Sequence, residues 1–445
     1  MRSHVVLVLL LLNLLAVFSL PVVVSGDGTA VGDLQVALIY STRTVSVLLS
    51  LAAVWLGCAG LSREIEAYNL HLVMTKPAHA RVVWLGKWLG VLAVTGGTFV
   101  LSCAVIHGLV ALRVHRSSFP AEERMKAANE VLVGRRVFRP AVPDFKGAAV
   151  AEYEKMKKAG TLAADHSPEA VISELERQFK ARSTEIPARM ARAWRFSGLR
   201  VPEGTQAVHV RYRVYIDSTS QSKQRETVGN WAVINPEAPQ EQQVAISGMQ
   251  QIMGGSFHEF AFPATMVAPS GVVFLEYTNG DPQEVSAVFQ TEDGPEILLR
   301  VTGFAGNWWR GVAVGLLRLA LLAALGCAAG AAFSTPVAVF VSLAYLLLGA
   351  VVDTELGAPT RDSLGNITAW KFTDAVTHVC AQVVDKAVVS FRGFDVASSL
   401  TRGYLVEWGH LGALLVFQVL LRGGPLIVLG IWVLSRRELG KVIRR

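Results

Sequence analysis

The sequence predicts an α-helical polytopic membrane protein with about six transmembrane helices and an inserted extracytoplasmic α+β domain that contains an antiparallel β-sandwich. Composition is the first reason. Of the 445 residues, 52% are apolar and 17% are charged, whereas soluble domains carry about a quarter charged residues. Patterning is the second reason, because long uncharged runs flank a central stretch of ordinary soluble composition. These features exclude a disordered or fibrous protein and argue against a wholly soluble enzyme.

The crossings follow from the length of the apolar runs, since a spanning helix needs about twenty apolar residues. The uncharged run 319–352 is too long for one crossing. Ser334-Thr335-Pro336 predicts a break in it, and the resulting hairpin has a first helix that starts near Gly311. The other expected crossings are 5–24, 44–61, 88–112 and 411–434. The expected segments are therefore 1–114 with three crossings, 115–200 and 201–304 for the inserted domain, 305–353 with two crossings, 354–408 as an outer segment, and 409–445 with the last crossing and a basic tail.

The first apolar run has two interpretations. It follows the short basic start Met1-Arg2-Ser3-His4 and precedes Ser25-Gly26, which also fits a cleaved signal peptide. A run of about twenty apolar residues is long for a signal peptide. We therefore expect an uncleaved anchor, and either outcome leaves the other crossings unchanged.

Basic residues beside the crossings predict the orientation, because Lys and Arg accumulate on the cytoplasmic side. The segment 62–87, between the second and third crossings, is rich in them, and so is the C-terminal tail. Six crossings place both segments and both termini in the cytoplasm. The net charge of +7 is thus mainly an orientation signal, and we expect no nucleic-acid partner.

The inserted domain has two halves of opposite charge. Residues 115–200 hold 17 Lys and Arg against 11 Asp and Glu, and the cap Ser167-Pro168 with apolar residues at helical spacing predicts helices. Their basic side is expected to face solvent or anionic lipid headgroups. Residues 201–308 hold 5 basic against 12 acidic residues and alternate with period two. One predicted face holds Val208, Val210, Tyr212, Val214 and Ile216, and six further short strands with turn residues between them predict a jelly-roll or immunoglobulin-like sandwich.

Catalytic and metal-binding motifs are not found in the sequence. It has no GxxxxGK[ST] phosphate loop, no HExxH and no GxSxG, and its four cysteines lack CxxC spacing. We therefore predict no enzyme activity, no cofactor and no metal site. ATP-driven work would need nucleotide hydrolysis by another polypeptide.

The cytoplasmic segment 62–77 carries the most informative pattern. Apolar residues lie on one side of a predicted helix, Arg63, Glu64 and Glu66 begin the other side, and Pro77 ends it. A short helix of mixed charge between two crossings offers a docking surface for a soluble partner. The alternative is a solvated loop that is placed by the positive-inside rule.

A further pattern continues into the third crossing, and its residues are Arg63-Glu64-Ile65-Glu66, Leu70, Leu72, Thr75-Lys76-Pro77, Arg81 and Gly86-Lys87. It resembles the first cytoplasmic loop of type-2 ATP-binding-cassette (ABC) exporter permeases, where an acidic pair precedes a leucine-rich run, a [TS][KR]P turn and a GK that enters the next span. Residues 430–439 similarly resemble the end of that family's last span. The resemblance covers the membrane frame, a little over half of the chain.

The resemblance implies the transmembrane permease subunit of an exporter in the bacterial cytoplasmic (inner) membrane. It implies that 62–81 includes the coupling helix that seats in a separate ABC ATPase subunit, which binds the ATP. It also implies that two permeases pair as a homodimer or a heterodimer, and it leaves the substrate open. The docking residues that it implies are Arg63, Glu64, Glu66, Leu70, Thr75, Lys76, Pro77 and Arg81.

Arg318 and Arg422 lie within apolar stretches, where a charge is costly unless it is paired or reaches the headgroups. Both are candidates for a polar translocation path for an anionic or lipid-linked substrate, and snorkelling to the outer headgroups is the alternative. Gly423-Gly424-Pro425 predicts a kink in the last crossing. Residues 367–391 predict an outer amphipathic helix. The resemblance implies that it is one of the outer re-entrant or interfacial helices that close the translocation path, and the alternative is a helix that packs on the inserted domain.

Two other functions fit the same layout. Lipopolysaccharide-extracting permeases also place a β-domain between the third and fourth of six crossings and pass lipid to a periplasmic bridge. A membrane-anchored scaffold or sensor without transport is the second. In the exporter hypothesis, the outer domain receives cargo, binds a periplasmic accessory protein, or acts as a lid.

Overall fold

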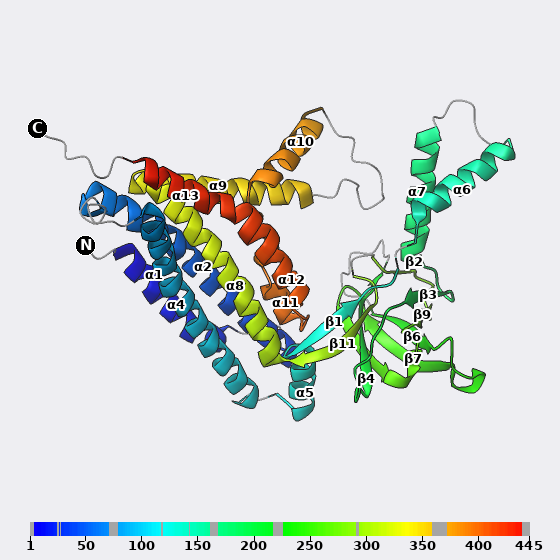
Figure 1. Cartoon of the computed structure of the whole chain (residues 1–445). Coiled ribbons are helices and arrows are strands. Elements are labelled where there is room, and N and C mark those ends of the chain that lie inside the picture. The colour runs from blue at the N-terminus through cyan, green and yellow to red at the C-terminus, as the bar shows by residue number, and fades with distance from the viewer. Residues whose placement is uncertain are drawn as a thin grey trace, which may run out of the picture. The chain divides into compact units, whose positions relative to one another are not determined.

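The computed structural model describes residues 4–24, 26, 28–70, 79–116, 119–141, 143–160, 168–216, 226–290, 293–357 and 372–437. The chain divides into two compact units. The helical unit comprises Met1–Gly134, Thr302–Ala358 and Phe372–Arg445, and the β unit consists chiefly of Arg135–Val301. The ribbon of Figure 1 shows the helices and the sheets that make up the two units.

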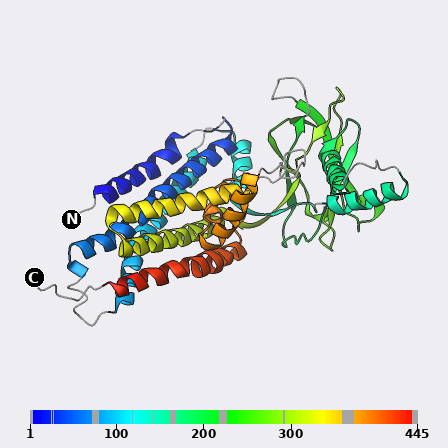
Figure 2. The same ribbon diagram turned by 90° about the horizontal axis from the view of Figure 1, so that it is seen from above.

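Among the described residues, six helical stretches are long and apolar enough to cross a membrane. Within the helical unit they lie side by side (Figure 2). The prediction of about six such helices is confirmed, and so is the break at Ser334 that separates the fourth from the fifth. They are α1 (His4–Val23), α2 (Ala30–Glu66), α4 (Ala80–Arg116), α8 (Phe304–Ala332), α9 (Thr335–Gly357) and a last stretch of α12 (Trp408–Ala413), the π-helix η4 (Leu414–Arg422) and α13 (Gly423–Arg436).

Helix α8 is the centre of the helical unit. Its most apolar window is 72% buried, against 22% in α1 and 17% in the last stretch. Small residues explain this burial, because they let helix backbones approach closely. A Cβ atom added to Gly330 of α8 would lie 2.5 Å from the carbonyl oxygen of Cys58 on α2, and one added to Gly326 would lie 2.7 Å from that of Val54. Helices α2 and α8 therefore pack backbone against backbone.

Helix α2 is longer at both ends than the expected crossing 44–61. It begins after Thr29, whose Oγ1 accepts a hydrogen bond from the Gly32 N–H at 3.0 Å. It ends at Glu66 because Tyr68 adopts a left-handed backbone conformation with φ 59°. Residues 62–66 were expected to start a separate docking helix, and this expectation is corrected: they form the last turn of α2, since no Gly or Pro interrupts the helix there.

The rest of the helical unit consists of shorter elements. They are α5 (Ala121–Glu130), α10 (Phe372–Ala387), η3 (Arg392–Phe394) and α11 (Ala397–Thr401). Helix α5 belongs to this unit because Ala127 and the neighbouring Val131 are buried in its hydrophobic core. The inserted domain was expected to begin at 115, and the structure differs in that the β unit begins at Arg135.

The β unit contains three sheets, with strand orders β1-β11-β4-β8, β2-β10-β5 and β3-β9-β6-β7, and its registered pairs are antiparallel. Both four-stranded sheets contribute side chains to one core. The expected inward face is confirmed for Val208, Val210, Tyr212 and Val214, each at most 1% exposed. The strands are β1 (Val133–Phe138), β2 (Glu185–Ile186), β3 (Ala191–Phe196), β4 (Ala207–Arg213), β5 (Tyr215–Ile216), β6 (Glu226–Ile234), β7 (Val244–Met253), β8 (Phe257–Pro263), β9 (Val273–Asn279), β10 (Ala287–Val288) and β11 (Glu296–Gly303).

The expectation of a helical segment over 115–200 is only partly met. Helices α6 (Phe145–Lys158) and α7 (Pro168–Thr184) lie there, but so do strands β1, β2 and β3. Strand β3 pairs with β9 along its whole length. Arg192 lies on the same side of β3 as Trp194 and Phe196, and Arg195 lies on the other side, so charged and apolar residues do not show the period-two pattern that marks a strand. The short helices η1 (Gln240–Gln242) and η2 (Ala264–Met266) complete the unit.

Candidate functional site

A cavity of about 320 Å³ lies within the helical unit, between α2, α4, α8 and the connector that contains η3 and α11. Part of its wall is charged, with Arg43, Arg318 and Asp395. Another part of the wall is apolar and includes four aromatic side chains, which are Phe99, Trp308, Phe391 and Phe394. Polar groups that converge in a mostly apolar cavity are the usual anatomy of a small-molecule site.

Two glycines of α8 let neighbouring side chains approach closely at the wall of the cavity. Gly311 and Gly315 are one turn apart, and Cβ atoms added to them would lie 2.6 Å from Leu400 Cδ1 and 2.5 Å from the Phe99 ring, so these side chains pack directly against the α8 backbone. The connector is held against α8 by Asn307, whose Nδ2 donates to the Tyr404 carbonyl and whose Oδ1 accepts from the Val406 N–H, both at 2.8 Å. The connector therefore lines one side of the cavity with fixed geometry.

The charges of the cavity do not cancel. Arg43 Nη2 lies 3.0 Å from Asp395 Oδ2, and the two side chains are 51% and 47% exposed. The other oxygen of Asp395 accepts a hydrogen bond from the Ala397 N–H at 3.2 Å. Among the residues that the structure describes, none forms a hydrogen bond with the buried Nε of Arg318, although the Asp395 carboxylate attracts this guanidinium electrostatically. Two guanidinium groups against one carboxylate leave a positive excess.

Of the two arginines singled out from the sequence, Arg318 lines this cavity and Arg422 does not. Arg422 instead lies at the end of η4, where its Nη2 is 3.2 Å from Asp385 Oδ2 and its Nη1 donates to the Val388 carbonyl at 3.3 Å. Its charge is therefore paired with α10 inside the helical unit.

Sequence reasoning missed Arg43 and Asp395. Arg43 comes one residue before the expected second crossing, and Asp395 lies between the last two. One signal was present in α2, since Thr42, Ser46 and Ser50 recur every four residues and place hydroxyl groups on the cavity face. A polar stripe on an otherwise apolar helix marks the side that faces a cavity rather than lipid.

The expected docking segment begins at the C-terminal end of α2, beyond the part of the helix that lines the cavity. Arg63 is half-buried in the last turn, Glu64 forms an ion pair with Lys87 of α4, and Glu66 and Arg81 are exposed. Leu70 is 1% exposed. Thr75, Lys76 and Pro77 lie outside the described residues. The described part of this segment is therefore fixed to α2 and α4, and its charged side chains point outward at Glu66 and Arg81.

An apolar cluster fixes this end, and we call it the docking-end cluster. It joins α2, α4, α8 and α13, and Gly430 of α13 lets Trp84 approach, since a Cβ there would lie 2.6 Å from Trp84 Nε1. Arg437 also donates to the carbonyl of Ala332 at the end of α8. The docking-end cluster consists of Leu61, Leu70, Trp84, Ala324, Cys327, Ala328, Ala331 and Leu434.

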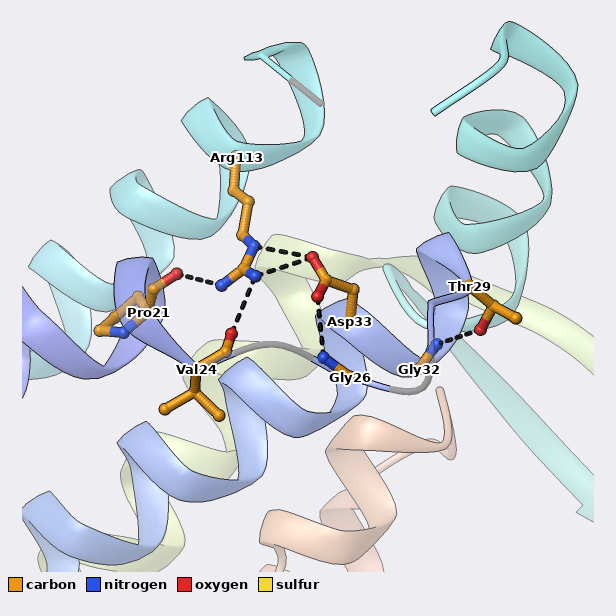
Figure 3. A network of polar contacts seen from close by, with 7 residues as sticks. All are labelled: Pro21, Val24, Gly26, Thr29, Gly32, Asp33 and Arg113. Carbon is orange, nitrogen blue, oxygen red and sulfur yellow. Dashed lines mark hydrogen bonds and ion pairs between the residues drawn. The ribbon is translucent and has the colours of Figure 1, made fainter. Parts of the chain in front are cut away.

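A polar network joins α1 to α2 and α4 (Figure 3). Arg113 of α4 forms an ion pair with Asp33, with Nη2 at 2.7 Å from Oδ2, and also donates to the carbonyl oxygens of Pro21 and Val24. The other Asp33 oxygen accepts from the Gly26 N–H at 2.9 Å. These contacts hold the α1–α2 connection against α4.

The β unit contains a buried charge cluster. Glu259 Oε1 accepts from Arg135 Nη1 and lies 3.1 Å from His209 Nδ1. Burial acts to raise the pKa of Glu259, but the hydrogen bond from His209 and the charge of Arg135 outweigh it, and the pKa lies below its usual value. This cluster ties β1 to β4 and β8.

Comparison with known protein families, characterised proteins and solved structures finds no match for this chain.

Proposed function

We propose that this chain is the membrane-spanning subunit of an ATP-driven ABC exporter, energised by a separate ATPase subunit. The observation that supports it best is the course of α2 and α8. Each helix runs from the docking-end cluster to the charged cavity. A partner that moves the exposed end of α2 would therefore act on α2 and α8, two of the three helices that line the cavity.

The contact between α2 and α8 is suited to carry such a movement. Gly57, Gly326 and Gly330 bring the two backbones too close for any side chain between them. Packed interfaces of this kind shift as rigid bodies rather than deform continuously. Nucleotide-driven movement of the partner would thus change the width of the cavity, because the packed middle of the helix pair does not absorb it.

The remaining features of the proposal concern orientation and partners. The basic segments 62–87 and 436–445 would lie in the bacterial cytoplasm with both termini, and the β unit would lie outside, free to contact a periplasmic accessory protein. Two permeases, identical or different, would form the path in the lipid bilayer. ATP would be held by the partner ATPase, and nucleic acid has no part in it.

Co-purification tests the partnership directly. The intact chain is purified in detergent from its native host, and the preparation is assayed for ATP hydrolysis with and without partner proteins. We expect a phosphate-loop ATPase to co-purify and the chain stripped of it to show no hydrolysis. ATP hydrolysis by the isolated chain, or a stable preparation that contains no ATPase, would overturn the proposal and favour a scaffold or sensor.

Charge reversal tests the docking surface. Glu66→Lys changes an exposed side chain at the end of α2, so we expect normal folding but roughly tenfold weaker ATPase binding. Glu123→Lys, on the exposed side of α5, is the matched control and should bind the ATPase normally. Equal binding by the two variants would show that the ATPase docks elsewhere.

A further inference from the structure

The cavity of the helical unit carries an inference about its ligand that deepens the proposed function. We propose that it binds a monoanionic amphiphile, whose negative headgroup pairs with Arg318 and whose apolar part lies against the aromatic side chains of the cavity. The binding step is independent of ATP, and only the subsequent transport of the amphiphile rests on the export function.

The headgroup charge follows from the balance of charges in the cavity. Arg43 already pairs with Asp395, and both Asp395 oxygens accept hydrogen bonds. The buried Nε of Arg318 lacks a hydrogen-bond partner among the described residues, and a guanidinium without an ion pair is costly within apolar helices. One negative charge at Arg318 would neutralise the excess, while a cationic ligand would add to it and a neutral ligand would leave the arginine unpaired.

The apolar part of the ligand follows from the lining. Trp308 Nε1 already donates to the Cys103 carbonyl at 3.2 Å, so its indole presents only an apolar surface to the cavity. Phe99, Phe391 and Phe394 extend this surface. A small inorganic anion would leave these rings in contact with water, whereas hydrocarbon would remove them from it.

The size of the cavity limits how much of the ligand is enclosed. A volume of about 320 Å³ equals that of roughly ten water molecules, which suffices for a headgroup and a short apolar segment. The rest of a longer chain would leave on the side where Arg43 and Asp395 are about half exposed. A fatty acid or an acidic lipid meets these requirements, and both share the same chemistry.

Binding of a fluorescent fatty acid tests the proposal. Dansyl-aminoundecanoic acid is titrated into the full chain in a neutral detergent, its methyl ester serves as the uncharged counterpart, and inorganic phosphate and phosphatidylglycerol serve as competitors. We expect the acid to bind more tightly than the ester and phosphatidylglycerol to displace it. If the ester bound as tightly as the acid, the site would not recognise the charge of the ligand. If phosphate at equal concentration displaced the acid, the site would not recognise its apolar part.

Variants at Arg318 and Asp395 identify the residues that bind, with Arg310→Gln on the same helix as the control because Arg310 lies outside the cavity lining. Arg318→Leu should weaken binding roughly tenfold or more, because a charge-assisted hydrogen bond is lost. Arg318→Lys keeps the charge and should retain most of the binding affinity. Asp395→Asn should bind several-fold more tightly, since it removes the opposing charge. Unchanged affinity in both Arg318→Leu and Asp395→Asn would overturn the proposal even if export is ATP-driven, whereas normal binding without ATP-driven export would overturn only the proposed function.

Discussion

Charged side chains with buried atoms form an ion pair in the β unit, whereas one such side chain of the helical unit does not. In the β unit, Arg135 and Glu259 are 1% and 7% exposed and pair with each other, and His209 completes the cluster. In the helical unit, Arg318 lines a cavity and forms no ion pair with any residue that the structure describes, and the Asp395 carboxylate that attracts it pairs with Arg43 instead. A paired buried charge serves the fold, because removing one partner strands the other. An unpaired charge beside a cavity has no such role in the fold and is available to a ligand.

This difference does not come from the apolar character of the helices. Arg113 and Asp33 form a pair in the same unit, each 19% exposed, and Arg113 makes two more hydrogen bonds to backbone carbonyls. Arg422 likewise pairs with Asp385. Arg113 and Arg422 are therefore paired within the same unit, whereas Arg318 is not.

The largest effect is expected in the β unit. Glu259→Gln leaves Arg135 buried without its counter-charge, and removal of one partner of a buried pair costs about 3–5 kcal/mol. This loss of stability is measured by thermal unfolding of the full chain, with hydrogen exchange of the peptide that contains β4 as the probe. A loss below about 1 kcal/mol would show that the cluster does not hold the sheet together.

The pH dependence of the same cluster gives a second measurement. The pKa of Glu259 is lowered in the folded protein, so its ionised form adds stability above the unfolded pKa of about 4.3, and this stability is lost as pH falls through the folded pKa. The difference between the wild type and Glu259→Gln should therefore be full at pH 7 and shrink in acid. A difference that stays constant down to pH 3 would contradict this account.

The network of Arg113 should give the next largest effect. Arg113→Leu removes an ion pair and two bonds to carbonyl oxygens, and we expect a loss of about 2–3 kcal/mol. Arg43→Gln breaks an ion pair that is about half exposed and should cost less than about 1 kcal/mol. Chemical unfolding of the helical unit in mixed micelles compares the two. Equal losses would show that burial does not decide the strength of these pairs.

The packing of α2 on α8 should show a smaller effect. Gly330→Ala places a Cβ 2.5 Å from the Cys58 carbonyl oxygen, so we expect a loss of about 1–2 kcal/mol. Gly97→Ala adds the same methyl group in open space on α4 and should leave stability unchanged or slightly higher. Thermal unfolding of the two variants in parallel checks this, and a tolerated Gly330→Ala would show that the helices can separate.

Long apolar runs predicted the helices of this fold well, since a crossing helix is specified by local composition alone. The extent of α2 was not predictable in the same way, because residues 30–43 and 62–66 contain charged and polar side chains that packing and a cap keep helical. Strand β3 was missed because its arginines hide the period-two pattern, and only pairing with β9 identifies it.

The candidate site was predicted only in part. Arg318 stood out because a charge in an apolar run is costly wherever the rest of the chain lies. Arg43 and Asp395 are 352 residues apart in the sequence, and nothing local links them. The same limit applies to Arg422, whose pairing with Asp385 of α10 depends on how two distant segments pack.

The stability of Arg318→Leu tests the central distinction between paired and unpaired charges most directly. Thermal unfolding of this variant is compared with that of Arg113→Leu in the same detergent without ligand. The account predicts that Arg318→Leu keeps the wild-type unfolding temperature or exceeds it, because a desolvated and unpaired charge is removed. A decrease as large as that of Arg113→Leu would contradict it, since Arg318 would then be a structural residue rather than a binding group.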